Sequence, residues 1–164
     1  MSDLWKGCLR CQEKSCCRLD IAHPLFVTQQ EMKIIEELYP DKAGSFNKTL
    51  PCPFLMRDGL CMIHESKPVD CRLFPFDIVK TDGEFFWIVW KLDCHILGES
   101  GRFEEYLRDL EERLLPGFTP YLGAYSSFRL DELSSKYDCE VLRKLRVNKA
   151  SERDSQRHMQ SLDW

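Results

Sequence analysis

Several features are scarce in this sequence, and each absence excludes a class of protein. No apolar run approaches the roughly 20 residues that a helix needs to cross a bilayer, and the longest, at positions 85–90, has the length of a strand. The first residues, MSDLWKGCLRC, lack the apolar segment of a secretory signal. The formal net charge is -4, so the chain has no electrostatic attraction for nucleic acid or an anionic membrane. We therefore expect a cytoplasmic protein that binds neither.

Two catalytic patterns are also missing. Cys8 and Cys11 form a C-x-x-C pair, but the strand–helix–strand pattern of a thioredoxin-like redox fold does not surround it. No glycine-rich loop between a strand and a helix offers a site for a methyl donor. The length of 164 residues, with 43% apolar, suits one domain with a core of ordinary size.

Cysteine, by contrast, is abundant, with nine residues. In a reducing compartment, cysteines are more often metal ligands or redox groups than a disulfide framework, and an odd number fits poorly with full pairing. Eight of the nine lie within the first 94 residues. The ninth, Cys139, stands alone in a helical pattern, and we interpret it as a small buried hydrophobic residue.

The eight cysteines form two groups and a single later residue. The first group has the spacing C-x2-C-x4-C-C, the second lies in the stretch CPFLMRDGLCMIHESKPVDCRLFPF, and Cys94 follows downstream. Thiolates favour zinc or iron–sulfur clusters, each held by four ligands. Eight cysteines would fill two such sites, or one site with thiols to spare. Cys16 and Cys17 fit awkwardly on one ion, because neighbouring side chains of an extended backbone point to opposite faces.

A helix is predicted between the two cysteine groups. Thr28 and Glu31 form a T-x-x-E capping box, and apolar residues at helical spacing follow it. The helix is predicted over residues 28–39 and ends at Pro40. A polar connection is predicted over residues 41–50.

Two further helices are predicted after the cysteine groups. Apolar residues at helical spacing predict one over residues 102–115, ended by Pro116 and Gly117. Another is predicted over about 130–146. The polar tail over 148–164 has no period, and we expect it to be poorly ordered.

Two short hairpins are predicted in the region of the second cysteine group. Asp-Gly at positions 58–59, between apolar runs, indicates the first turn, and positions 81–84 indicate the second. The first strand of the second hairpin is predicted to begin at Leu73. Cys71 and Cys94 then lie near the same end of this hairpin, as a shared ligand site requires.

The cysteine motifs of this sequence resemble those of a known family. The pattern C-x2-C-x4-C-C, then CPFL, then CMIHESKPVDCRLFPF and a later cysteine, is similar to the YkgJ-type cysteine-cluster family, described as a zinc- or iron-chelating domain. The resemblance covers about residues 7–95, although the family more often has Tyr at His64 and Arg at Lys67. The family includes a flagellin lysine N-methylase. The metal ligands that the resemblance implies are Cys8, Cys11, Cys16, Cys17, Cys52, Cys61, Cys71 and Cys94.

Two residues beside the cysteines are candidates for contact with a bound cofactor. Arg72 has two interpretations, and both stay open. In the first, its charge offsets a thiolate cluster or binds a substrate carboxylate. In the second, it forms an ion pair with Glu65 or Asp70. Phe74 is predicted to shield the metal from water, together with the proline and phenylalanine that follow it.

The histidines and tryptophans receive simpler interpretations. His23, His64 and His95 lie near cysteines in the sequence, but with eight cysteines present we expect each to support the site or lie at the surface. Trp87 and Trp90 are predicted to be core residues that share one face of a strand.

The sequence thus predicts a small, metal-stabilised α+β domain with cysteine-rich loops, two short β-hairpins and two to three packing helices, over residues 1–147. Its predicted function is to hold an iron–sulfur cluster or zinc through up to eight thiolates, with a redox role as an oxidoreductase. The alternatives are a structural zinc module that binds a protein partner, or an accessory domain of a methyltransferase-like enzyme.

Overall fold

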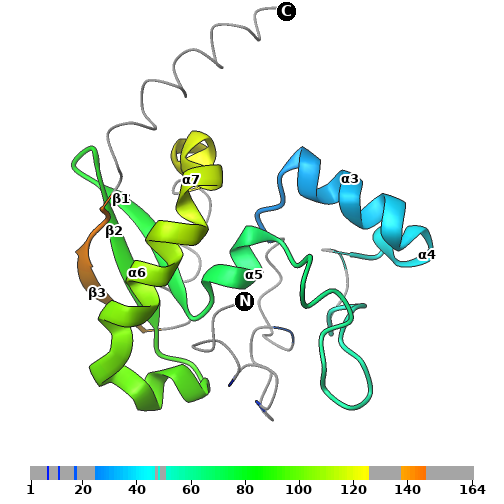
Figure 1. The fold of residues 1–164 in the computed structure, drawn as a ribbon, viewed down its shortest axis with the longest axis horizontal. Helices are drawn as coiled ribbons and strands as arrows, with labels where there is room; N and C mark the ends of the chain where they lie inside the picture. The colour runs from blue at the N-terminus through cyan, green and yellow to red at the C-terminus, as the bar shows by residue number, and fades with distance from the viewer. Residues whose placement is uncertain are drawn as a thin grey trace, which may run out of the picture.

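The computed structural model describes residues 7, 11, 17, 25–46, 48, 51–125 and 138–146. These residues form helices and a three-stranded antiparallel sheet, so the fold class is α+β, as the sequence predicts (Figure 1). The elements in chain order are α3 (Gln29–Leu38), α4 (Pro40–Ala43), α5 (Val69–Leu73), β1 (Phe76–Thr81), β2 (Glu84–Trp90), η2 (His95–Arg102), α6 (Phe103–Arg113), α7 (Leu115–Phe118), η3 (Thr119–Tyr121), α8 (Leu122–Tyr125) and β3 (Cys139–Lys144).

Helix α3 begins where the capping box places it. The Thr28 hydroxyl accepts a hydrogen bond from the Glu31 N–H at 3.2 Å, and the Glu31 carboxylate accepts one from the Thr28 N–H at 2.9 Å. The helix ends before Pro40, but Pro40 also begins α4, because proline fits the first turn of a helix. The predicted polar connection over residues 41–50 is therefore helical at its start.

The second predicted hairpin is formed by β1 and β2. Asp82 and Gly83 have φ of 52° and 81°, which suits the two-residue turns that match the twist of paired strands. The first strand begins later than predicted, at Phe76, because Val69–Leu73 forms the short helix α5. The first predicted hairpin is reduced to one bridge between Leu55 and Cys61.

Strand β3 corrects the predicted helix over residues 130–146. Residues 139–144 pair with β2 in an antiparallel register, with Cys139 opposite Trp90. Pairing with an apolar strand far away in the sequence decided the structure here, against the local helical spacing. The earlier part of the predicted helix and the tail over 148–164 lie outside the described residues.

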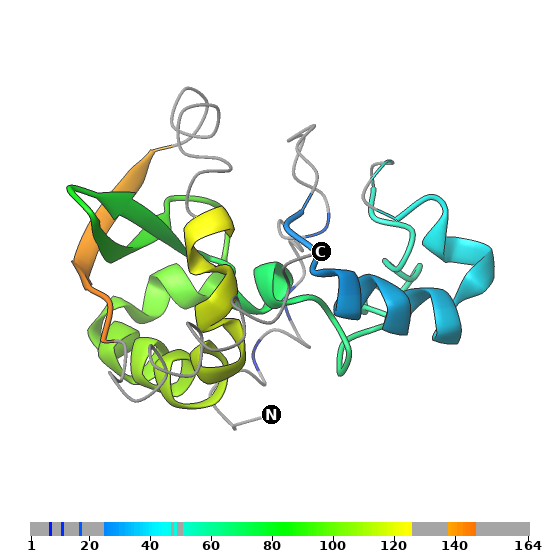
Figure 2. The same ribbon diagram turned by 90° about the horizontal axis from the view of Figure 1, so that it is seen from above.

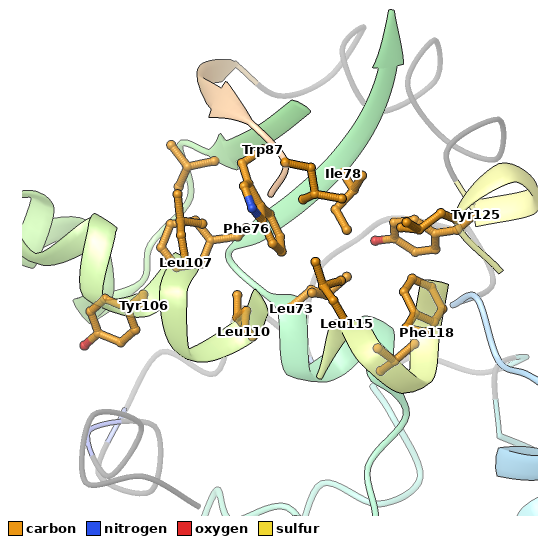
Figure 3. Close-up of a cluster of buried hydrophobic side chains, with 14 of the residues drawn as sticks. Leu73, Phe76, Ile78, Trp87, Tyr106, Leu107, Leu110, Leu115, Phe118 and Tyr125 are labelled. Atoms are coloured by element: carbon orange, nitrogen blue, oxygen red, sulfur yellow. The ribbon is translucent and has the colours of Figure 1, made fainter. Parts of the chain in front are cut away.

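The largest group of buried side chains lies between the sheet and the helices that follow it. Helix α6 is close to the prediction, but Pro116 and Gly117 lie in a further short helix, α7. Figure 3 shows Leu73 of α5 beside Leu110 and Leu115. The buried residues of this main apolar cluster are Val69, Leu73, Phe76, Ile78, Trp87, Val89, Ile96, Tyr106, Leu107, Leu110, Leu115, Phe118, Leu122, Tyr125 and Leu145.

The two tryptophans of β2 are both buried, but on opposite faces. Trp87 belongs to the main apolar cluster, whereas Trp90 packs with Val79 and Ile88 in a third apolar cluster. The prediction that they share a face was wrong, because residues three apart in a strand point to opposite sides.

A second apolar cluster lies on the other side of α5. It comprises Ile35, Ala43, Phe46, Phe54 and Ile63, with the Phe54 ring 5.2 Å from Phe46 and 5.4 Å from Tyr39, between centroids. In Figures 1 and 2, α3 and α4 lie to one side of α5, and the sheet with α6 lies to the other. Helix α5 therefore joins two separate apolar clusters. Among the helices that the structure describes, none is long and apolar enough to cross a membrane.

Candidate metal centre

The predicted ligands are distributed over both apolar clusters. Cys52 and Cys61 pack against the second cluster, and Cys94 packs against the main cluster. Cys71 lies in α5, between them. All four are half-buried, as are Cys11 and Cys17. Cys8 and Cys16, together with His23, lie outside the described residues.

One hydrogen bond joins the N-terminal cysteine group to the central one. The N–H of Cys52 donates to the carbonyl oxygen of Cys17 at 3.2 Å. The two residues are far apart in the sequence, yet their backbones are in contact. The structure therefore brings Cys17 of the first group and Cys52 of the second side by side. That the two groups form one ligand set stays a prediction.

Helix α5, which carries Cys71, is attached to the start of α3 by two bonds from carboxylates. Glu31 uses its second oxygen to accept the N–H of Val69 at 2.7 Å. Asp70 accepts the N–H of Phe26 at 2.7 Å. A short helix has unpaired N–H groups in its first turn, so these bonds fix both the helix and the position of Cys71.

A buried polar network includes Asp70, the residue that precedes Cys71 in α5. The Tyr125 hydroxyl contacts Asp70 at 3.1 Å and also bonds to Asp77. Trp90 donates its indole N–H to Asp77 at 3.0 Å. Burial raises the pKa of Asp77, against hydrogen bonds from Tyr125 and Trp90 that lower it. Burial and the negative charge of Asp77 raise the pKa of Tyr125 well above its usual value.

His95 is the residue whose surroundings sequence reasoning missed. Both ring nitrogens, Nδ1 and Nε2, are buried, and neither has a hydrogen-bond partner in the described part of the chain. The ring lies against Gly7, where a Cβ atom would stand 2.4 Å from Nε2. The only hint in the sequence is that His95 follows Cys94 and that Gly7 precedes Cys8.

Arg72 and Phe74, the two residues predicted to contact a cofactor, lie at and after the end of α5. Arg72 is exposed and donates from Nε to the carbonyl of Lys67 at 2.8 Å and from Nη2 to that of Glu65 at 3.3 Å. Phe74 is half-buried at the end of α5. Phe76, predicted to shield the metal beside it, lies in the main cluster against Phe103, with ring centroids 5.3 Å apart. Cofactor contact by Arg72 and Phe74 stays a prediction.

Cys139 lies on β3, not on the predicted helix, and packs against the third apolar cluster. Burial, followed by the nearby charges of Asp138 and Asp77, raises the pKa of its thiol. A raised pKa disfavours the thiolate that metals bind, in keeping with its interpretation as a small hydrophobic residue.

The donor set fits zinc or iron in its chemistry. Soft thiolates favour these metals, and an imidazole with buried, unpartnered nitrogens is a further donor. Within the described ranges, no three His, Cys, Asp or Glu side chains come close enough to hold an ion. The predicted set also includes Cys8 and Cys16, which those ranges omit.

Comparison with known proteins gave one result. A family model described as "Putative zinc- or iron-chelating domain", with the motif CxxCxxCC, matches residues 7–97. The matched range contains all eight cysteines of the predicted ligand set and also His95. Neither the curated proteins nor the solved structures that were searched gave a match.

Proposed function

Because the chain belongs to the cysteine-cluster family of zinc- or iron-chelating domains, we propose that its thiolates bind zinc or an iron–sulfur cluster between the two apolar clusters. The observation that carries this proposal is the hydrogen bond between Cys52 and Cys17. It brings Cys17 of the N-terminal group into contact with Cys52 of the central group.

The distribution of the thiols supports a role for the metal in holding the domain together. Cys52 and Cys61 belong to the second apolar cluster, Cys94 to the main cluster, and Cys71 to the helix between them. A metal bound by thiolates from both sides would connect the clusters, and its binding free energy would stabilise the folded state. Helix α5, attached through Glu31 and Asp70, would hold Cys71 in place before the metal binds.

An iron–sulfur cluster would supply one-electron transfer, and the protein would then act in redox chemistry. The second candidate function is a structural zinc module that presents a surface to a protein partner. The spread of cysteines over both clusters favours it, since structural zinc sites typically tie separate loops into one unit. An accessory role beside a methyltransferase-like enzyme rests on the family resemblance alone.

The test is elemental analysis with an absorption spectrum on protein purified without oxygen. A brown sample with broad visible absorption and about four irons per chain would identify a cluster and support the redox function. A colourless sample with one or two zinc ions would support the structural module. Full-length protein that retains neither metal after anaerobic purification, and binds neither when it is added, would contradict the proposal.

A further inference from the structure

The surroundings of His95 are unusual for a histidine in a folded protein. Both of its ring nitrogens are buried without a hydrogen-bond partner in the described part of the chain. A neutral imidazole carries one donor and one acceptor, and a protonated one carries two donors. Each buried polar atom without a partner lowers the stability of the folded state. Such an atom in a native structure calls for an explanation, and a bound ion is one of the few that apply.

The ring also lies against Gly7, the residue just before the N-terminal cysteine group. Its Nε2 edge lies so close to Gly7 that a Cβ atom there would be 2.4 Å from Nε2 and 2.8 Å from Cδ2. Only glycine permits this approach. The residue after Gly7 in the chain is Cys8, the first cysteine of the C-x2-C pair.

Cys94 and His95 are directed to different surroundings, although they are neighbours. The backbone of Cys94 is extended, with φ of −143° and ψ of 131°, and an extended backbone sends successive side chains to opposite sides. Cys94 packs against the main apolar cluster, whereas His95 packs against Gly7. The His95 ring thus lies against the residue that precedes the N-terminal cysteine group, in surroundings that differ from those of Cys94.

We propose that His95 is a nitrogen ligand of the metal held by the N-terminal cysteines, which makes that centre a mixed thiolate–imidazole site. This inference rests on the proposed function, because it requires a metal to be bound. It explains why an imidazole is buried without a partner and why glycine precedes the first cysteine. It also accounts for the awkward vicinal pair, since an imidazole ligand frees one thiol of Cys16 and Cys17 from that centre.

X-ray absorption at the zinc or iron edge of the full-length protein tests the proposal. Imidazole produces outer-shell scattering that thiolates do not. We expect this signal in the wild-type protein and its loss in His95→Ala. His95→Cys should restore the metal content with a sulfur-only shell. The matched control, His64→Ala, removes another half-buried histidine near the cysteines and should leave the imidazole signal unchanged.

A second pair of variants displaces the His95 ring while leaving the histidine itself unchanged. Gly7→Ala places a methyl group where the His95 ring now lies, and we expect it to remove the imidazole signal while the thiolates remain. Gly44→Ala is the control, because no atom lies within 4 Å of its Cβ position. A wild-type spectrum with metal but sulfur ligands alone would overturn the role of His95 and leave the proposed function intact. A wild-type protein that binds no metal would overturn both.

Discussion

At the residue scale, the network around Tyr125 poses a question of proton placement. The hydroxyl contacts carboxylates of both Asp70 and Asp77, but it has a single proton to donate. A second hydrogen is available if Asp77 is protonated, and burial raises its pKa in that direction. The network is therefore best satisfied when one of its carboxyls is neutral.

Because of this network, the free energy of unfolding should depend on pH, in a direction set by the raised pKa of Asp77. A raised pKa means that the folded state binds the Asp77 proton more tightly than the unfolded chain does. The resulting stabilisation is complete below the unfolded pKa of about 3.9 and is lost as pH rises through the folded pKa. We expect the stability advantage of wild type over Asp77→Asn to be largest in acid and to shrink with rising pH. Urea unfolding of both proteins across a pH series measures it, and an advantage that grew with pH would contradict the assignment.

A second residue-scale prediction concerns Cys71. Replacement of its thiol by a hydroxyl in Cys71→Ser removes a soft ligand, so metal content and melting temperature should fall together. The measurements are elemental analysis and thermal unfolding on the same sample. Cys139→Ser is the matched control, because Cys139 lies outside the family match and packs against the third apolar cluster. Unchanged metal in Cys71→Ser would remove Cys71 from the ligand set.

At the element scale, one carboxylate of α6 joins β3, which already pairs with β2, to the helix and to Trp87. Glu111 of α6 accepts hydrogen bonds from Arg143 at 2.7 and 2.9 Å and from the backbone N–H of Arg146 at 2.8 Å. It also accepts the indole N–H of Trp87 at 2.9 Å. Burial alone would raise the pKa of Glu111. The hydrogen bonds, led by that from Arg143, lower it by more, so the pKa lies below its usual value. Helix, central strand and edge strand therefore meet at one charged group.

Glu111→Gln should lower the free energy of unfolding by about 3 kcal/mol, because it leaves the charge of Arg143 without its mostly buried partner. Chemical denaturation measures the change. The control is Glu112→Gln, an exposed position one residue along the same helix, which should change stability by no more than about 0.5 kcal/mol. Equal effects at the two positions would show that the network contributes little.

At the scale of the whole molecule, the described residues contain two apolar clusters with α5 between them (Figure 2). If the metal connects these clusters, a chelator should loosen the N-terminal cysteine segment and make residues 7–20 susceptible to protease. Limited proteolysis with mass spectrometry measures the cleavage sites. Helix α6, packed within the main cluster, serves as the internal control and should resist cleavage with and without chelator. Continued resistance of the N-terminal segment would count against a metal that organises it.

The sequence predicted the parts of the fold that depend on local signals. The capping box of Thr28 and Glu31 identified α3, and the Asp-Gly turn identified the β1–β2 hairpin. Strand β3 was missed because its conformation depends on pairing with β2, which no residue within 139–144 encodes. The cysteine motif identified the family, since its spacing is a property of the sequence itself. The burial of the two His95 ring nitrogens could not be foreseen, because the ring packs against Gly7 from the opposite end of the matched region.

The late position of β3 in the chain has a consequence for synthesis on the ribosome. Proteins emerge from their N-terminus, and early segments fold while later ones are still being made. The β1–β2 hairpin and α6 leave the ribosome well before residues 139–146, so for that interval the carboxylate of Glu111 has the indole of Trp87 but neither Arg143 nor Arg146. The open edge of β2 is then available to other nascent chains. A chain that stops before β3 should therefore depend more on chaperones than the full-length protein.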